Sequence, residues 1–142
     1  MFKAESVMTR TVITVKGATP IYEAVSLLVK HGISGLPVVD NDYKLVGILS
    51  EKDALKLLHH TPETGLSVAD FMTKKAIAFS PQDSLIDICN CLIQNPFRRV
   101  PIVEKNGKLV GIISRRDIMK QILKIKQVDI YNTSGDIDGE LA

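Results

Sequence analysis

Apolar and polar positions follow the same order twice along the chain. In the first half, Val12–Val15, Leu36–Val39 and Leu45–Leu49 are short apolar runs typical of buried strands. Between the first two runs, apolar residues recur at the spacing of one helix face, at Ile21, Ala24, Val25, Leu28 and Val29. A second helix is expected to begin after Ser50 and to continue to about Leu58. The predicted unit is therefore β-α-β-β-α.

Polar and turn-forming residues set the expected boundaries of this unit. Thr19 stands where a helix cap belongs, with Pro20 at the first helical position. Gly32 is expected to end that helix. Asn41-Asp42 predicts the turn between the two later strands, and the segment His59–Leu66 reads as a linker.

The second half repeats this order of elements. Ala76–Phe79 predicts a strand, and Asp83 is the expected cap of a helix over Ser84–Gln94. Val100–Val103 and Leu109–Ile113 predict a hairpin across Lys105-Asn106-Gly107, because Asn-Gly favours a tight turn. The last helix is expected from Arg115 to about Lys126.

An offset of 64 residues aligns the two halves without a gap. Of the 49 positions from Met8 to Lys56, 14 are identical to their counterparts from Met72 to Lys120. We interpret this as a tandem duplication, with repeat one at 1–61, repeat two at 62–126 and an acidic tail at 127–142. The expected fold class is α/β (α+β), with two pseudo-symmetric units packed sheet to sheet around a shared core.

One motif recurs where a strand runs into a helix. Gly47-x-x-Ser50-x-x-Asp53 has its copy at Gly111-x-x-Ser114-x-x-Asp117. Ser-x-x-Asp is typical of a capping box, which would serve stability alone. The start of a helix also offers backbone N–H groups and a positive dipole end to an anion. Both interpretations stay open for the motif by itself.

The distribution of charge along the chain indicates where an anionic ligand would bind. The net charge is +2, but residues 65–128 carry eleven basic and five acidic side chains, and residues 129–142 carry four acidic and no basic ones. We expect an anion to bind the second half, and the tail to dock there or on a second copy.

No apolar run is long enough to cross a membrane, and the N-terminus lacks a signal-peptide pattern. Cys89 and Cys91 point to different helix faces, so a reduced, cytoplasmic setting fits best.

Taken together, these motifs resemble a pair of cystathionine-β-synthase (CBS) domains, the Bateman module, from Ala4 to about Lys124. The resemblance rests on Val68-Ala69-Asp70-Phe71-Met72-Thr73, on Leu36-Pro37-Val38-Val39-Asp40 and on the doubled Gly-x-x-Ser-x-x-Asp. It implies a regulatory fold that binds AMP, ADP, ATP or S-adenosylmethionine between its repeats. It also implies that the acidic residue holds the ribose hydroxyls and that the serine faces ribose or phosphate.

The family pattern completes each site with residues of the other repeat. Applied to this sequence, it places Ser50 and Asp53 opposite Ile77, Phe97, Arg98 and Arg99. It places Ser114 and Asp117 opposite Ile13, Ile33, Ser34 and Gly35. The first cleft thus has two guanidinium groups for phosphate and the second has none at the matching place, so the first should bind more tightly.

The resulting hypothesis is a stand-alone, non-enzymatic ligand sensor that acts on an effector protein in trans. The alternative is an RNA- or DNA-binding protein that uses the basic second repeat, but few aromatic residues are available for stacking on bases. No nucleophile and base stand at recognisable spacing, and no metal site is expected.

Homodimerisation through helical faces is predicted from apolar helix positions, namely Val25, Leu28, Val29, Leu55, Leu58, Leu92, Met119 and Ile122.

Overall fold

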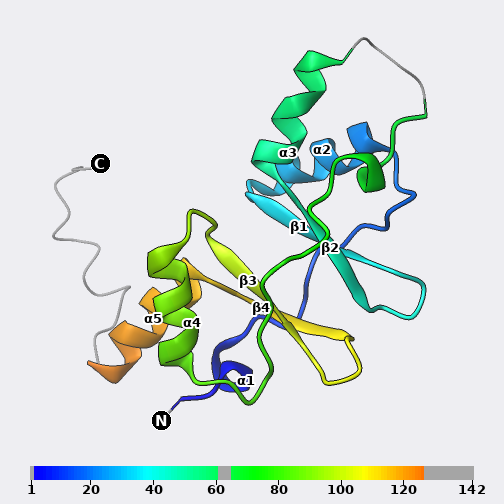
Figure 1. Ribbon diagram of the computed structural model, residues 1–142. Coiled ribbons are helices and arrows are strands. Elements are labelled where there is room, and N and C mark those ends of the chain that lie inside the picture. Colours follow the sequence, from blue (N-terminus) through cyan, green and yellow to red (C-terminus); the bar gives the residue numbers. More distant parts are fainter. Residues whose placement is uncertain (1, 61–64, 127–142) are drawn as a thin grey trace, which may run out of the picture.

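The computed structural model describes residues 2–60 and 65–126, which form two similar α+β units (Figure 1). The first unit consists of α2 (Ile21–His31), β1 (Gly35–Val39), β2 (Leu45–Ser50), α3 (Glu51–Leu55) and the 3-10 turn η1 (Lys56–His59). The second consists of α4 (Leu85–Gln94), β3 (Arg99–Val103), β4 (Leu109–Ser114) and α5 (Arg115–Ile125). A short leading helix precedes each unit, α1 (Ala4–Val7) and the 3-10 turn η2 (Val68–Asp70). The α+β class and the duplicated organisation are confirmed.

Each unit contains one two-stranded antiparallel sheet, and the two sheets have the same register. Gly35 pairs with Ser50 in the first sheet, and Arg99 pairs with Ser114 in the second. The hairpin ends join the sheets, since Leu45 donates a backbone hydrogen bond to Gly107 and Leu109 donates one to Tyr43. This cross-connection follows the pseudo-twofold relation that the repeat predicted.

The expected strands at Val12–Val15 and Ala76–Phe79 are wrong as full strands. Each segment makes only a single parallel bridge, Val15 with Val38 and Phe79 with Ile102. Within these two segments the described backbone bonds involve only Val15 and Phe79, and residues before them line the cavities described below. That position suits residues that contact a ligand rather than a neighbouring strand.

Two helix caps lie one residue away from where the sequence placed them. The first residue of α2 is Ile21, and the hydroxyl of Thr19 accepts a bond from the amide of Lys16 instead of capping the helix. Ser84, and not Asp83, caps α4 by accepting from the amide of Asp87. Gly32 ends α2 at φ 60°, as expected of a residue without a Cβ.

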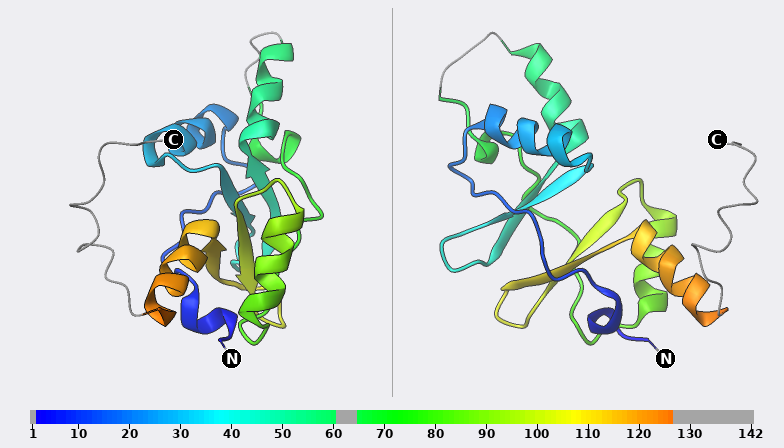
Figure 2. Two further views of the ribbon diagram at one scale, coloured as in Figure 1. Left: turned by 90° about the vertical axis from the view of Figure 1, so that its left-hand side faces the viewer. Right: turned by 180° about the vertical axis from the view of Figure 1, so that it is seen from behind.

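The leading segments are exchanged between the repeats. Ala4 and Met8 belong to the buried cluster of the second unit, whereas Val68 and Phe71 belong to that of the first. Figure 2 shows α1 beside the second unit from both directions. The described residues therefore bury two separate clusters, one in each unit, and the expectation of one shared core is wrong.

Two glycines make this exchange possible. A Cβ on Gly47 would lie 2.8 Å from the carbonyl oxygen of Thr73, and one on Gly111 would lie 2.6 Å from Sδ of Met8. The Met-Thr pair that begins each repeat thus packs against the glycine of the other repeat. The first residue of the Gly-x-x-Ser-x-x-Asp motif is accounted for by packing rather than by ligand chemistry.

Apolar side chains remain exposed on the outer helices. Val29 is 78% exposed, Leu58 is 89% exposed, and Leu55, Met119 and Ile122 are also exposed. Leu28 and Leu92, which the sequence analysis assigned to a dimer surface, are buried within their own units, so that assignment is wrong for these two residues. Val25 is partly buried against the first cluster.

Candidate functional site

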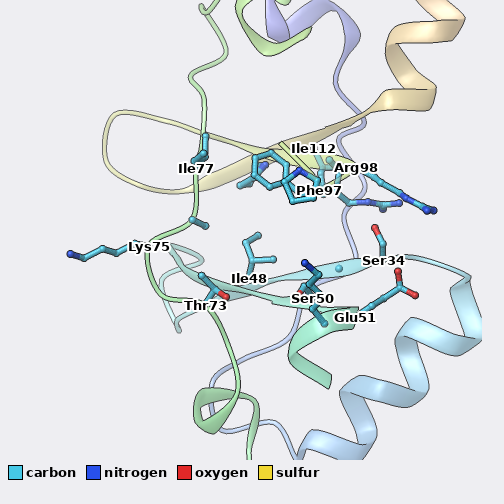
Figure 3. Close-up of a pocket in the computed structure, with 16 residues that line it drawn as sticks. Ser34, Ile48, Ser50, Glu51, Thr73, Lys75, Ile77, Phe97, Arg98 and Ile112 are labelled. Atoms are coloured by element: carbon cyan, nitrogen blue, oxygen red, sulfur yellow. The ribbon is translucent and has the colours of Figure 1, made fainter. Parts of the chain in front are cut away.

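The larger cavity, here the first cavity, lies between the two hairpins and has a volume of about 470 Å³. This volume falls within the range of roughly 300–1,000 Å³ typical of small-molecule sites. Its walls are apolar over much of their area, with Ile77, Phe97 and Ile112 on one side and Ile48 on the other (Figure 3). Arg98 extends toward the end of the cavity where Ser34 and Glu51 lie. An apolar slot with cations at one end suits a planar ring that bears an anionic group.

Cations surround this cavity more densely than the sequence suggested. Four basic side chains line it, Lys52, Lys75, Arg98 and Arg99, together with the carboxylate of Glu51. Lys75 stands at the mouth of the cavity with its side chain pointing away from the interior (Figure 3). The positive potential at the first cavity therefore exceeds that of an arginine pair alone.

The smaller cavity, here the second cavity, has a volume of about 200 Å³ and lies on the other side of β3 and β1. Ser114 and Asp117 line it, opposite Ile13, Ile33 and Gly35. Thr9, Thr11, Val12, Pro37, Ile112 and Arg99 complete its wall. Arg99 is the one basic side chain among the described residues of this wall.

The structure brings most of the predicted site residues together across the repeats. Ser50, Ile77, Phe97, Arg98 and Arg99 meet in the first cavity, and Ile13, Ile33, Gly35, Ser114 and Asp117 meet in the second. Four placements differ from the expectation. Asp53 lies outside the wall of the first cavity, Ser34 lines the first cavity instead of the second, and Gly35 and Arg99 each line both.

Ser50 and Asp53 form a complete capping box at the start of α3. Asp53 accepts from the amide of Ser50 at 3.0 Å, and the amide of Asp53 donates to Oγ of Ser50 at 3.1 Å. The first amide of α3, that of Glu51, donates to the carbonyl of Ser34. Ser114 and Asp117 cap α5 in the same way. The helix start therefore offers fewer N–H groups to an anion than the motif alone implied.

The two aspartates nevertheless differ in their surroundings. Asp53 is 5% exposed and is not part of the first cavity's wall, whereas Asp117 lines the second cavity directly. Thr73 donates to Oδ2 of Asp53 at 3.3 Å, and Nζ of Lys56 lies 3.7 Å from Oδ1. Asp117 receives the equivalent threonine contact from Thr9, at 3.4 Å. Each threonine belongs to the exchanged leading segment, a contact that the repeat alone did not reveal.

Arg99 is the most unusual group of the site. Its Nε is buried and has no hydrogen-bond partner among the described residues. Burial lowers the pKa of its guanidinium, while the carboxylate of Asp117 raises it, Arg98 lowers it and Glu51 raises it to smaller extents. A buried donor without an acceptor is costly, so a shift of the Arg99 side chain that exposed this N–H to an anionic ligand would relieve the cost.

Arg115 has a structural role at the end of α4. One of its terminal nitrogens donates to the carbonyls of Leu92 and Asn95, both at 3.0 Å. These carbonyls lie at the C-terminal end of α4, where a cation is favourable. Arg115 thus holds the turn that carries Phe97 and Arg98.

Other kinds of site find little support within residues 2–60 and 65–126. No cluster of three or more His, Cys, Asp or Glu side chains comes close enough together there to hold a metal ion. The same part of the chain contains no helix of the length and hydropathy that a bilayer crossing requires. The acidic tail at 127–142 lies outside the described residues.

Comparisons with known proteins agree with this architecture. The CBS domain family model matches residues 4–60 and again residues 68–124. The chloroplastic CBS domain-containing protein CBSX1 of Arabidopsis thaliana is 34% identical over 80% of this chain, which spans 60% of that protein. The chain spans only 23% and 24% of two inosine-5'-monophosphate dehydrogenases that it also matches.

Solved structures extend the similarity to three dimensions. The structure of CBSX2 in complex with AMP superposes with a TM-score of 0.80 at 33% identity, over 89% of this chain and 99% of that one. The CBS domain pair of protein MJ0100, in complex with 5'-methylthioadenosine and S-adenosyl-L-methionine, gives a TM-score of 0.75 at 26% identity. It covers 88% of this chain and 98% of that one. Two family matches in tandem, on two interlocked α+β units, establish that this chain belongs to the CBS domain family as a CBS pair.

Proposed function

We propose that the chain is a regulatory module that binds an adenosine-type ligand in the first cavity. The observation that carries this proposal is the combination of an apolar slot, formed by Ile77 and Phe97, with Arg98 and Arg99 beside it. A purine ring is planar, with faces that stack well against apolar side chains, and phosphate matches the donor fork of a guanidinium. AMP, ADP and ATP all carry both features.

Binding of the ribose requires a rearrangement of the side chains around Asp53. A carboxylate can accept two hydrogen bonds from a cis-diol, which is the role proposed for Asp53. Its Oδ2 already accepts from Ser50 and Thr73, whereas among the described residues Oδ1 is paired only with the ammonium of Lys56, at 3.7 Å. We therefore propose that Oδ1 receives the ribose hydroxyls once Lys56 moves away. Ser50 stands at the cavity wall beside it.

The ligands of the related structures support an adenosyl compound. CBSX2 was crystallised with AMP, and the MJ0100 pair with methylthioadenosine and S-adenosylmethionine. The dense positive charge at the first cavity favours the phosphorylated members of this group over S-adenosylmethionine, which itself carries a sulfonium cation. We place AMP first among the candidates.

We further propose that the output is a change of assembly or of a partner protein and not a chemical reaction. The exposed apolar side chains of Val29, Leu58 and Met119 suit contact with a second copy of the chain. An effector protein regulated in trans and a cytoplasmic location both stay predictions.

The proposal is tested by calorimetric titration of AMP, adenosine and a short oligonucleotide into the intact protein. AMP should bind more tightly than adenosine, and Arg98→Gln should weaken AMP binding by about tenfold or more while leaving adenosine nearly unchanged. Arg116→Gln is the matched control, because Arg116 is an exposed arginine that lines neither cavity. Binding of the oligonucleotide but not of AMP would favour the nucleic-acid alternative.

A further inference from the structure

Arg99 occupies a position that the two cavities share. It is the first residue of β3, and it lines the first cavity and the second cavity alike. Its counterpart under the 64-residue offset is Gly35, the first residue of β1, which also lines both. The position is thus common to both cavities by the symmetry of the fold, and only the second repeat places a charged side chain there.

The two cavities depend on this side chain to different extents. The first cavity has Lys52, Lys75 and Arg98 as well as Arg99. The second has Arg99 alone among the described residues of its wall, next to the carboxylate of Asp117. An anion in the second cavity without Arg99 would face Asp117 with no compensating cation in that wall.

Arg99 lies between two carboxylates, that of Asp117 at the second cavity and that of Glu51 at the first. Its Nε is buried without a partner among the described residues. The opposite charges that act on it come from Asp117 at the second cavity and from Glu51 at the first. A guanidinium carries a single positive charge, so a phosphate that it contacts at one cavity weakens the attraction that it offers to a second phosphate at the other.

From this geometry we propose that Arg99 couples the two cavities, so that an anionic ligand in one weakens the binding of an anionic ligand in the other. The inference rests on the proposed function, since it concerns the same adenosine-type ligands. A neutral nucleoside does not compete for the guanidinium and escapes the penalty. The pair of cavities therefore accepts one phosphate-bearing ligand readily and favours a neutral ligand as the second.

The test needs a separate signal from each cavity, and two isoleucines provide it. Ile77 lines only the first cavity and Ile13 only the second, so their methyl NMR signals report the occupancy of each during a titration with AMP. Each cavity is blocked in turn by a tryptophan at an exposed residue of its own wall. Ile77→Trp blocks the first and Thr11→Trp blocks the second.

The expected result is a gain of affinity when the competing cavity is blocked. Whichever cavity fills second in the unblocked protein should bind AMP at least about fivefold more tightly once the other is closed, because coupling free energies of this kind are reciprocal and typically of that size. Adenosine should show no such gain. In the Arg99→Gln background the gain for AMP should vanish, and Ile13 should no longer report a preference for AMP over adenosine.

Arg98→Gln is the matched control, because Arg98 lines only the first cavity. It should weaken AMP at Ile77 and leave the gain on blocking intact. The inference is overturned if the gain persists in Arg99→Gln, if adenosine shows the same gain, or if the unblocked protein fills both cavities independently. It is also overturned if AMP never reaches Ile13 even in Ile77→Trp. If AMP moves neither signal, the proposed function itself fails.

Discussion

Single residues of this CBS pair serve both packing and chemistry, and the two roles can be separated. Ser50 and Asp53 cap α3, and Asp53 is also the proposed ribose acceptor. Nε of Arg99 is buried without a hydrogen-bond partner in the part of the chain that the structure describes, a cost that a folded chain retains at functional positions more readily than elsewhere. Gly47 and Gly111, by contrast, have a purely steric role.

The aspartates give the first prediction at this scale. Asp53→Ala should weaken AMP binding in the first cavity by roughly tenfold or more, because a hydrogen bond to a charged acceptor contributes about 1.5–3 kcal/mol. Asp117→Ala should leave the first cavity nearly intact, since Asp117 lines only the second. Calorimetry on both variants measures this. The reverse pattern would mean that the cavities are assigned to the wrong aspartates.

Both substitutions also remove half of a capping box, so stability must be measured beside affinity. Each should lower the free energy of unfolding by about 0.5–2 kcal/mol, the usual cost of losing a cap. A loss of AMP affinity that appears equally in both variants would reflect damage to the fold instead of a ribose contact.

At the scale of elements, the interlocked leading segments hold the two units in register. Met72 and Thr73 pass over β2, where the amide of Ile48 donates to the carbonyl of Thr73 at 2.9 Å. Met8 and Thr9 pass over β4 in the same manner, with Thr9 and Ile112 exchanging backbone bonds. Each capping box thereby receives a threonine from the other repeat's leading segment.

The glycines of the repeated motif test this interlock. Gly47→Ala should lower the free energy of unfolding by about 1–3 kcal/mol, since its Cβ would meet the backbone carbonyl of Thr73 at 2.8 Å. Gly111→Ala should cost less, because its contacts are all with the flexible side chain of Met8. Chemical denaturation of both variants gives the comparison. An equal cost would show that the carbonyl contact relaxes as easily as the methionine.

The spacing of apolar residues predicted the helices and the two hairpins, because this spacing depends only on residues close together in the sequence. It did not predict the exchange of α1 and η2, because Met8 and Met72 are identical and the sequence does not say which glycine each will meet. The same limit applies to the cavities. The offset pairs Arg99 with Gly35, but only the packing of the two sheets places that pair between both cavities.

The N-caps of α2 and α4 show a second limit of prediction from the sequence. Thr19 and Ser84 are both plausible caps, and the choice depends on competing backbone bonds. The amide of Lys16 takes the hydroxyl of Thr19, and the amide of Ser80 takes the carboxylate of Asp83, which leaves Ser84 to cap α4. The sequence does not reveal the positions of Lys75 and Arg115 for a similar reason, since charge alone does not tell which carbonyl or cavity a long side chain will reach.

At the scale of the whole molecule, the outer helices carry apolar side chains that a monomer leaves in water. Those of the first unit include Val29, Leu55 and Leu58, and those of the second include Met119 and Ile122. Because the repeats are related by a pseudo-twofold relation, a second copy could cover both helical faces with similar contacts.

A dimer leads to a further prediction. Light scattering at micromolar concentration should give twice the mass of the chain, and Leu58→Glu or Met119→Glu should shift the protein toward monomer. Lys105→Gln is a suitable control, because it changes the charge by the same single unit on an exposed hairpin turn. A monomeric unaltered protein at that concentration would contradict the prediction.

The central claim is that an adenosine nucleotide occupies the first cavity, and a crystal structure of the protein with AMP tests it most directly. We predict that the purine lies between Ile77 and Phe97 with the phosphate against Arg98 and Arg99, and that Lys56 has moved away from Asp53. AMP bound elsewhere on the chain, or a first cavity that stays empty at saturating AMP, would contradict the account.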